Sequence, residues 1–124
     1  MFFLGWRGHD DLPNGIACAD LFVAPSVDEP FGQVYLEAMG CAVPVIATRS
    51  GGPLSYVNTE PGRPNGWHVE PDDLDSLVEA LVEAVRSPDE RRERGENAYR
   101  QVQSGYSWQS LSERFVAVYE TVMS

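Results

Sequence analysis

The sequence predicts an α/β fold, with a small parallel sheet followed by three helices. In residues 1–70, short apolar runs alternate with helical segments, an order typical of strand–helix–strand units with parallel strands. Beyond residue 70 the pattern is helical throughout. We therefore expect a single domain over residues 1–124, made of a sheet region at 1–70 and a helical tail at 71–124.

The elements of the sheet region are predicted from apolar runs and from the turn residues between them. Gly51-Gly52-Pro53 marks a turn that opens a short helix through Val57, and the composition of Glu60–Gly66 is typical of a surface loop. Strands are expected at Phe2–Gly5, Leu21–Ala24, Pro44–Thr48 and Trp67–Glu70, and helices at Asp10–Ala19 and Gly32–Met39.

The three helices of the tail have different patterns. Ser87-Pro-Asp-Glu90 has the form of a capping box, and the polar helix that it opens, with Arg91–Arg94, is expected to lie on the surface. Ser107 is expected to cap the last helix. The first helix has a single apolar face, and an apolar stripe in the last one predicts core packing. The face contains Leu74, Leu77, Val78, Leu81, Val82 and Val85, and the stripe contains Trp108, Leu111, Phe115, Val118 and Val122.

Composition excludes two classes of partner. The net charge is −10, with nine arginines and no lysine, so the surface repels nucleic acid and anionic membranes. No apolar run approaches the roughly 20 residues that a membrane span needs, and residues 1–6 lack the form of a signal peptide. Cys18 and Cys41 lie in apolar surroundings, and we expect buried, reduced thiols and therefore a cytoplasmic protein.

Two carboxylates eight positions apart are the strongest functional signal. Glu29 follows the strand expected at Leu21–Ala24, and Glu37 lies in the helix that begins near Gly32. Open α/β sheets bind ligands in such loops, at the carboxyl ends of their strands. Carboxylates accept hydrogen bonds from sugar hydroxyls, and the free amides of a helix N-terminus suit a phosphate. The pattern therefore predicts a sugar–phosphate ligand.

Two glycine-containing segments adjoin these carboxylates. Gly32, Gln33 and Val34 form the first helical turn, which either cradles a diphosphate or is an ordinary strand–turn–helix junction. Gly51 and Gly52 follow the next strand at the same edge of the sheet. They either let the backbone approach a ligand closely or simply make a tight turn.

The two histidines are isolated in the sequence. His9 follows a predicted strand and could touch a ligand, whereas His68 is expected to face solvent. Neither histidine has the spacing of a metal site, and the cysteines are too scattered to complete one.

Together these residues resemble the carboxyl-terminal donor-binding domain of retaining GT-B glycosyltransferases of family 4, a Rossmann-like domain. The resemblance covers almost all of the chain, and the paired glutamates are its most specific part. The matching segments occur in the family's order: Ala19-Asp20, Pro25-Ser26, Glu29–Thr48, Gly51-Gly52, Asn65-Gly66 and Ser107-Trp108.

The resemblance implies a role for each site residue. Glu29, as the catalytic position, contacts hydroxyls of the donor sugar, and Glu37 holds the ribose hydroxyls. The base lies near Trp6 and Arg7. These enzymes use a nucleotide-diphosphate sugar as donor and need no metal ion or other cofactor. The sugar and phosphates face the amides of Phe31, Gly32 and Gln33, with Val34 close by.

Three departures from the family pattern are visible. Pro30 replaces a common glycine and removes one N–H donor, and Ser55 stands where many members place a glutamate. The resemblance also implies that the first two strands of the donor domain, whose basic residues normally bind the diphosphate, and the acceptor domain are missing from this sequence. We therefore expect the chain to be part of a glycosyltransferase, or alternatively a non-catalytic module that binds nucleotide sugars or pairs with a protein.

The missing strands would lie between Phe2–Leu4 and Leu21–Ala24 in a doubly wound sheet. Their absence predicts an open strand edge at Leu21–Ala24, with unpaired backbone groups. Either Phe2–Leu4 pairs there directly, or a second chain does. We favour the second chain, which is another copy of this protein or a complementing glycosyltransferase chain.

Overall fold

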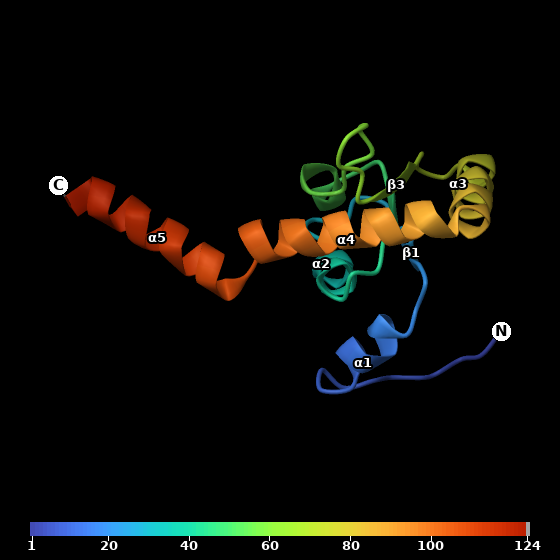
Figure 1. Cartoon of the computed structure of the whole chain (residues 1–124), viewed down its shortest axis with the longest axis horizontal. Coiled ribbons are helices and arrows are strands. Elements are labelled where there is room, and N and C mark those ends of the chain that lie inside the picture. The colour runs from blue at the N-terminus through green and yellow to red at the C-terminus, as the bar shows by residue number, and fades with distance from the viewer. Residues whose placement is uncertain (124) are drawn as a thin grey trace.

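The computed structural model describes residues 1–123 and confirms the predicted α/β class (Figure 1). Three parallel strands lie in the order β1-β2-β3, and three helices follow them in the chain. The elements are α1 (Leu12–Ala17), β1 (Phe22–Ala24), α2 (Gln33–Gly40), β2 (Val45–Thr48), the 3-10 helix η1 (Gly52–Ser55), β3 (Gly66–Val69), α3 (Leu74–Arg86), α4 (Pro88–Gly105) and α5 (Trp108–Met123).

The central strand β2 is buried along its whole length, and both of its faces contribute to a core. Val45 and Ala47 belong to a cluster that includes residues of α2 and α4, whereas Ile46 belongs to a second cluster with residues of α3. A strand covered on both faces has a continuous apolar run rather than an alternating one, which is why this segment was recognisable in the sequence.

The expected strand at Phe2–Gly5 is absent, so that prediction was wrong. Residues 1–7 carry no regular structure, and the side chains of Phe2 and Phe3 are 93% and 92% exposed. A strand needs a neighbour to pair its N–H and C=O groups, and the only neighbour of β1 in the described sheet is β2. Direct pairing of Phe2–Leu4 with Leu21–Ala24 is therefore not formed, and one edge of β1 is open.

The buried side of α3 is shifted from the predicted face. Ala80 and Ala84 are buried, with Leu77 and Leu81 packed beside them. The other members of the predicted face are exposed: Leu74, Val78, Val82 and Val85. The helical period was predicted correctly, but the predicted face was chosen from the larger apolar side chains. The face that packs on the sheet contains small alanines instead, because they allow α3 to approach the sheet closely.

The helix α4 also differs from expectation. Ser87 makes no side-chain capping bond, so the predicted capping box is not formed. Arg94 is only 7% exposed, so the run Arg91–Arg94 is not a fully solvated face. Ser107 does cap α5, because its Oγ accepts a bond from the amide of Ser110 at 3.1 Å.

The apolar stripe of α5 is not part of the core, contrary to the prediction. Trp108, Phe115 and Val122 are 89%, 64% and 77% exposed, and no residue of α5 is buried within the described chain. Figure 1 shows the reason, since α5 extends away from the sheet and from the helices that cover it.

Candidate functional site

The loops after β1 and β2 meet at the carboxyl edge of the sheet and are hydrogen-bonded to each other. The amide of Gly52 donates to the carbonyl of Glu29 at 2.8 Å, and the amide of Asp28 donates to Ser50 Oγ at 3.1 Å. The two glycine-containing segments predicted to share this edge do lie together there.

Glycine is required in the second loop because the first loop packs directly on it. Gly51 has φ 62° and ψ −147°, a conformation that side chains disfavour. A Cβ on Gly52 would lie 2.5 Å from Phe31 Cα. The close backbone approach expected at Gly51-Gly52 is thus made, but to the chain's own loop at residues 29–31.

Glu29 organises the entry into α2. Its carboxylate oxygen Oε1 accepts a bond from the amide of Gly32 at 3.0 Å, and Gly32 has a left-handed conformation with φ 76°. The Gly32 amide therefore already has a protein partner. Gln33 and Val34 are exposed in the first turn, where amides have no partner within the helix. Both amides are available to an anion at this helix end.

Tyr56 is a residue of this site that the sequence did not indicate. It is 2% exposed, and its hydroxyl lies 2.5 Å from the carbonyl of Phe31 and 3.0 Å from that of Gly32. Burial raises the pKa of its hydroxyl, so the group remains a proton donor to these carbonyls. Tyr35 acts similarly at the end of β1, since its hydroxyl donates to the carbonyl of Ala24. No motif marks either tyrosine, because the sequence does not show what a buried hydroxyl reaches.

Glu37 lies within α2, where its side chain is half-buried. It lines a cavity of about 170 Å³ between α1 and α2. His9, Leu12, Pro13, Ile16 and Cys41 complete the lining. Burial, and then the charge of Glu37, raise the pKa of the Cys41 thiol. The structure thus places His9 and Glu37 at the same cavity. Of the two histidines, His9 is the one that the sequence analysis expected to contact a ligand.

The remaining predicted positions are less enclosed. Trp6 is 90% exposed and Arg7 is exposed as well, both on the irregular N-terminal segment. Cys18 is exposed and Cys41 is half-buried, so the expectation of two buried thiols was wrong, although both are free.

His68 does not face solvent freely, contrary to the prediction. Its ring is half-buried in β3, and Nε2 is buried without a hydrogen-bond partner in residues 1–123. Burial lowers the pKa of its imidazole, and the nearby charge of Arg49 lowers it further. Because β3 pairs with β2, His68 lies beside Ala47 rather than at the carboxyl edge with Glu29.

Comparisons with known sequences match this chain to glycosyltransferases. A profile of the family described as "Glycosyl transferases group 1" matches residues 1–101. A GDP-mannose-dependent monoacylated alpha-(1-6)-phosphatidylinositol monomannoside mannosyltransferase from Corynebacterium glutamicum is 36% identical over 126 residues, which cover 96% of this chain and 32% of that protein. A D-inositol 3-phosphate glycosyltransferase from Corynebacterium jeikeium is 36% identical over 118 residues, covering 95% of this chain and 27% of that protein.

Solved structures show the same relationship. Sucrose-phosphate synthase from Thermosynechococcus elongatus matches 98% of this chain with a TM-score of 0.86 and 32% identity, over 30% of its own length. Anabaena HepE, solved in complex with UDP-glucose, matches 96% of the chain with a TM-score of 0.82 and 26% identity, over 32% of its length. The chain therefore spans about a third of the length of these relatives. In residues 1–123, no helix combines the length and apolarity needed to cross a bilayer.

Proposed function

Because this chain belongs to the glycosyl transferases group 1 family, we propose that it is part of the donor-binding domain of a retaining, family 4 glycosyltransferase with the GT-B fold. In this proposal it binds a nucleotide-diphosphate sugar and takes part in glycosyl transfer without a metal ion. The observation that carries the proposal is the joined pair of loops at the carboxyl edge of the sheet, with Glu29 at the start of α2 and Glu37 within it. Such an edge is where α/β sheets bind ligands.

Glu37 is proposed to hold the ribose. It is half-buried at a cavity and forms no ion pair within residues 1–123, so its two oxygens can accept bonds from adjacent hydroxyls. His9 lines the same cavity and could contact the nucleoside. The base would then lie towards the N-terminal segment, where Trp6 and Arg7 offer an aromatic face and a cation.

Glu29 is proposed to contact the donor sugar as the catalytic position. One of its oxygens is bonded to the Gly32 amide, which fixes the direction of the carboxylate and leaves the other oxygen for a sugar hydroxyl. The phosphates would lie against the amides of Gln33 and Val34, where the positive end of α2 favours an anion. Phe31 and Gly32 support this arrangement through the carbonyls that Tyr56 binds.

Two further parts of the proposal concern the setting of the enzyme. Free thiols at Cys18 and Cys41 suit a reducing cytoplasm.

The open edge of β1 suits pairing with a second chain, either another copy or a complementing glycosyltransferase chain. Light scattering on dilute protein tests the pairing, and a monomer at all concentrations would contradict it for a second copy.

Calorimetry with UDP-, GDP- and ADP-sugars tests the donor site. Bonds to a charged acceptor contribute about 1.5–3 kcal/mol, so Glu37→Ala should weaken nucleotide binding roughly 10-fold or more. Glu79→Ala removes the same charge from an exposed position of α3 and should change binding little. Equal binding by the two variants would overturn the ribose assignment.

Glu29→Gln should spare nucleoside diphosphate binding but reduce discrimination among sugars.

A further inference from the structure

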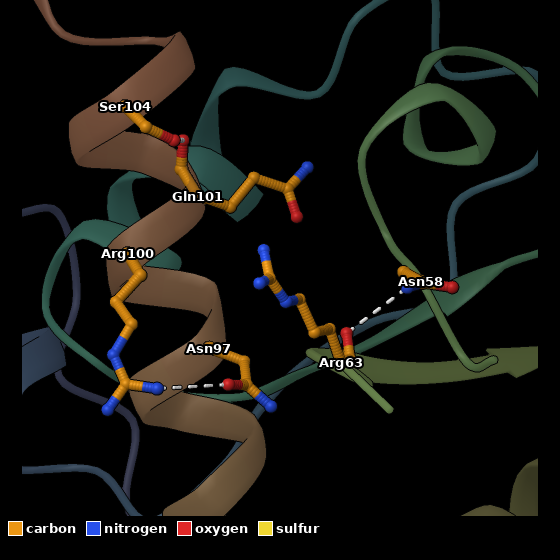
Figure 2. A pocket seen from close by; sticks show the side chains of 6 residues that line it. All are labelled: Asn58, Arg63, Asn97, Arg100, Gln101 and Ser104. Carbon is orange, nitrogen blue, oxygen red and sulfur yellow. Dashed lines mark hydrogen bonds between the residues drawn. The ribbon is translucent and has the colours of Figure 1, made fainter. Parts of the chain in front are cut away.

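A second, polar pocket lies between α4 and the loop that leads into β3. Because the strands are parallel, the start of β3 lies at the edge of the sheet opposite the carboxyl ends of β1 and β2. The pocket has a volume of about 550 Å³, within the range of small-molecule sites. Figure 2 shows its lining residues: Asn58, Arg63, Asn97, Arg100, Gln101 and Ser104.

The pocket is held in shape by hydrogen bonds that attach the loop to α4. Asn97 Nδ2 donates to the carbonyl of Pro64 at 2.9 Å. Gln101 Oε1 accepts a bond from the buried Asn65 at 2.5 Å, and Gln101 Nε2 donates to the carbonyl of Tyr56 at 2.9 Å. A ligand would therefore meet a largely preformed surface, which reduces the entropy lost on binding.

The lining is cationic in a strongly acidic protein. Among residues 1–123 the lining contains two arginines and no carboxylate, although the net charge of the chain is −10. In Figure 2 the Arg63 side chain extends from the loop into the pocket, towards Gln101. Within the same described residues Arg63 forms no ion pair. Arg100 lies on α4, 3.3 Å from a carboxylate oxygen of Glu96 and 3.4 Å from Asn97 Oδ1.

We propose that this pocket binds a phosphorylated, hydroxyl-bearing small molecule. Arg63 is the main phosphate ligand, because no carboxylate in residues 1–123 pairs with its guanidinium, and Arg100 adds charge from the α4 wall. The amide side chains that shape the pocket each keep a second N–H or a second oxygen lone pair, and the Ser104 hydroxyl can still accept a bond. These remaining groups can bond the hydroxyls of the ligand. The pocket shares no lining residue with the loops around Glu29, and Gln101 joins the two regions through its bond to the carbonyl of Tyr56.

Titration of the full chain with ribose 5-phosphate, ribose and inorganic phosphate tests the proposal. Ribose 5-phosphate should bind at least about 10-fold more tightly than either of the others, because it alone engages both the arginines and the amides. In NMR spectra the side-chain amide signals of Asn58, Asn97 and Gln101 should shift. Phosphate binding as tight as that of ribose 5-phosphate would overturn the hydroxyl contacts.

Arg63→Gln should weaken ribose 5-phosphate binding roughly 10-fold or more. Arg86→Gln removes the same charge from an exposed position of α3 and should leave binding unchanged. Equal affinities of the two variants, no binding at millimolar concentration, or NMR shifts confined to the backbone around Gln33 would each overturn the proposal. The last result would place the ligand at the donor site instead.

Discussion

Helices α4 and α5 are consecutive in the chain, yet they have opposite relations to the core. The sequence of α4 is rich in charged and polar residues, but its residues Arg94, Gly95 and Ala98 are buried. The sequence of α5 has a regular apolar stripe, but none of its described residues is buried. Figure 1 shows α4 running across the folded body, whereas α5 projects beyond it.

The burial of α4 depends on two residues that are unusual in a helix core. Gly95 has no side chain, and the backbone of Ala42 lies where its Cβ would be. Arg94 is buried because all parts of its guanidinium have partners. It donates to the carbonyl of Gly66, pairs with Glu90 and lies 4.1 Å above the ring of Trp67. A helix of low apolarity thus joins the core through close backbone approach and a satisfied cation.

This comparison shows that position in the fold, not apolarity, decides which helix stabilises the domain. An apolar residue contributes only when another surface removes it from water. In residues 1–123, only Leu111 of the α5 stripe is half-buried, and its other four residues are exposed. Substitutions in α4 should therefore have large effects on stability and substitutions in α5 small ones, and the following variants test that order.

Among substitutions in α4 and α5, the largest effect is expected from Gly95→Ala. The new methyl group would overlap the carbonyl of Ala42, so α4 must move away from the loop after α2. We expect a loss of about 3 kcal/mol in the free energy of unfolding, which outweighs the helix propensity that alanine gains. Gly105→Ala, also in α4, meets no atom within 4 Å and should be neutral or stabilising. Urea denaturation of both variants measures the difference, and equal stabilities would contradict the close packing of α4.

A somewhat smaller loss in the free energy of unfolding is expected from Arg94→Met. Methionine retains the apolar stem but leaves the carbonyl of Gly66 without its donor and removes the cation from Trp67. The lost bonds predict a decrease of about 2 kcal/mol in the free energy of unfolding. Arg92→Met is the matched control, since Arg92 is exposed and its pairing with Asp89 is worth little. If both variants unfold at the same urea concentration, Arg94 is not a structural cation.

Gln101→Ala should have an intermediate effect, because this side chain attaches α4 to the segment that follows η1. Its loss removes a bond to the carbonyl of Tyr56 and the acceptor for Asn65. We expect the free energy of unfolding, measured by thermal or urea denaturation, to decrease by about 1–2 kcal/mol. Gln103→Ala changes an exposed position of the same helix and should be neutral. A neutral Gln101→Ala would mean that the loop does not depend on α4.

The core of the fold was predictable where a single property dominates. The run Pro44–Thr48 is apolar enough to be recognised as a buried strand, and the structure places β2 there. The turn at Gly51-Gly52 was recognisable from its glycines, since the backbone of Gly51 favours glycine and Gly52 has no room for a side chain. The strand expected at Phe2–Gly5 failed because pairing is a property of two segments, and its own apolarity does not supply a neighbour.

The candidate site was predictable in position but not in its supports. Glu29 and Glu37 could be placed from the strand–turn–helix pattern around them. The hydroxyl of Tyr56 beneath the Phe31–Gly32 turn could not, because a residue 25 positions away in the chain reaches that turn only in the folded state. The same limit applies to Arg94, which the charge pattern of α4 placed in solvent.

The smallest effect is expected in α5, from the double variant Phe115→Ser and Val118→Ser. Both side chains are already exposed, at 64% and 62%, so their replacement removes little buried area, and serine has a helix propensity similar to that of both residues. The free energy of unfolding should change by less than about 0.5 kcal/mol. Met39→Ala, in the core, should by contrast lower the free energy of unfolding by about 2–5 kcal/mol. A loss of more than about 2 kcal/mol in the double variant would show that α5 is covered in solution, and the contrast with α4 would then fail.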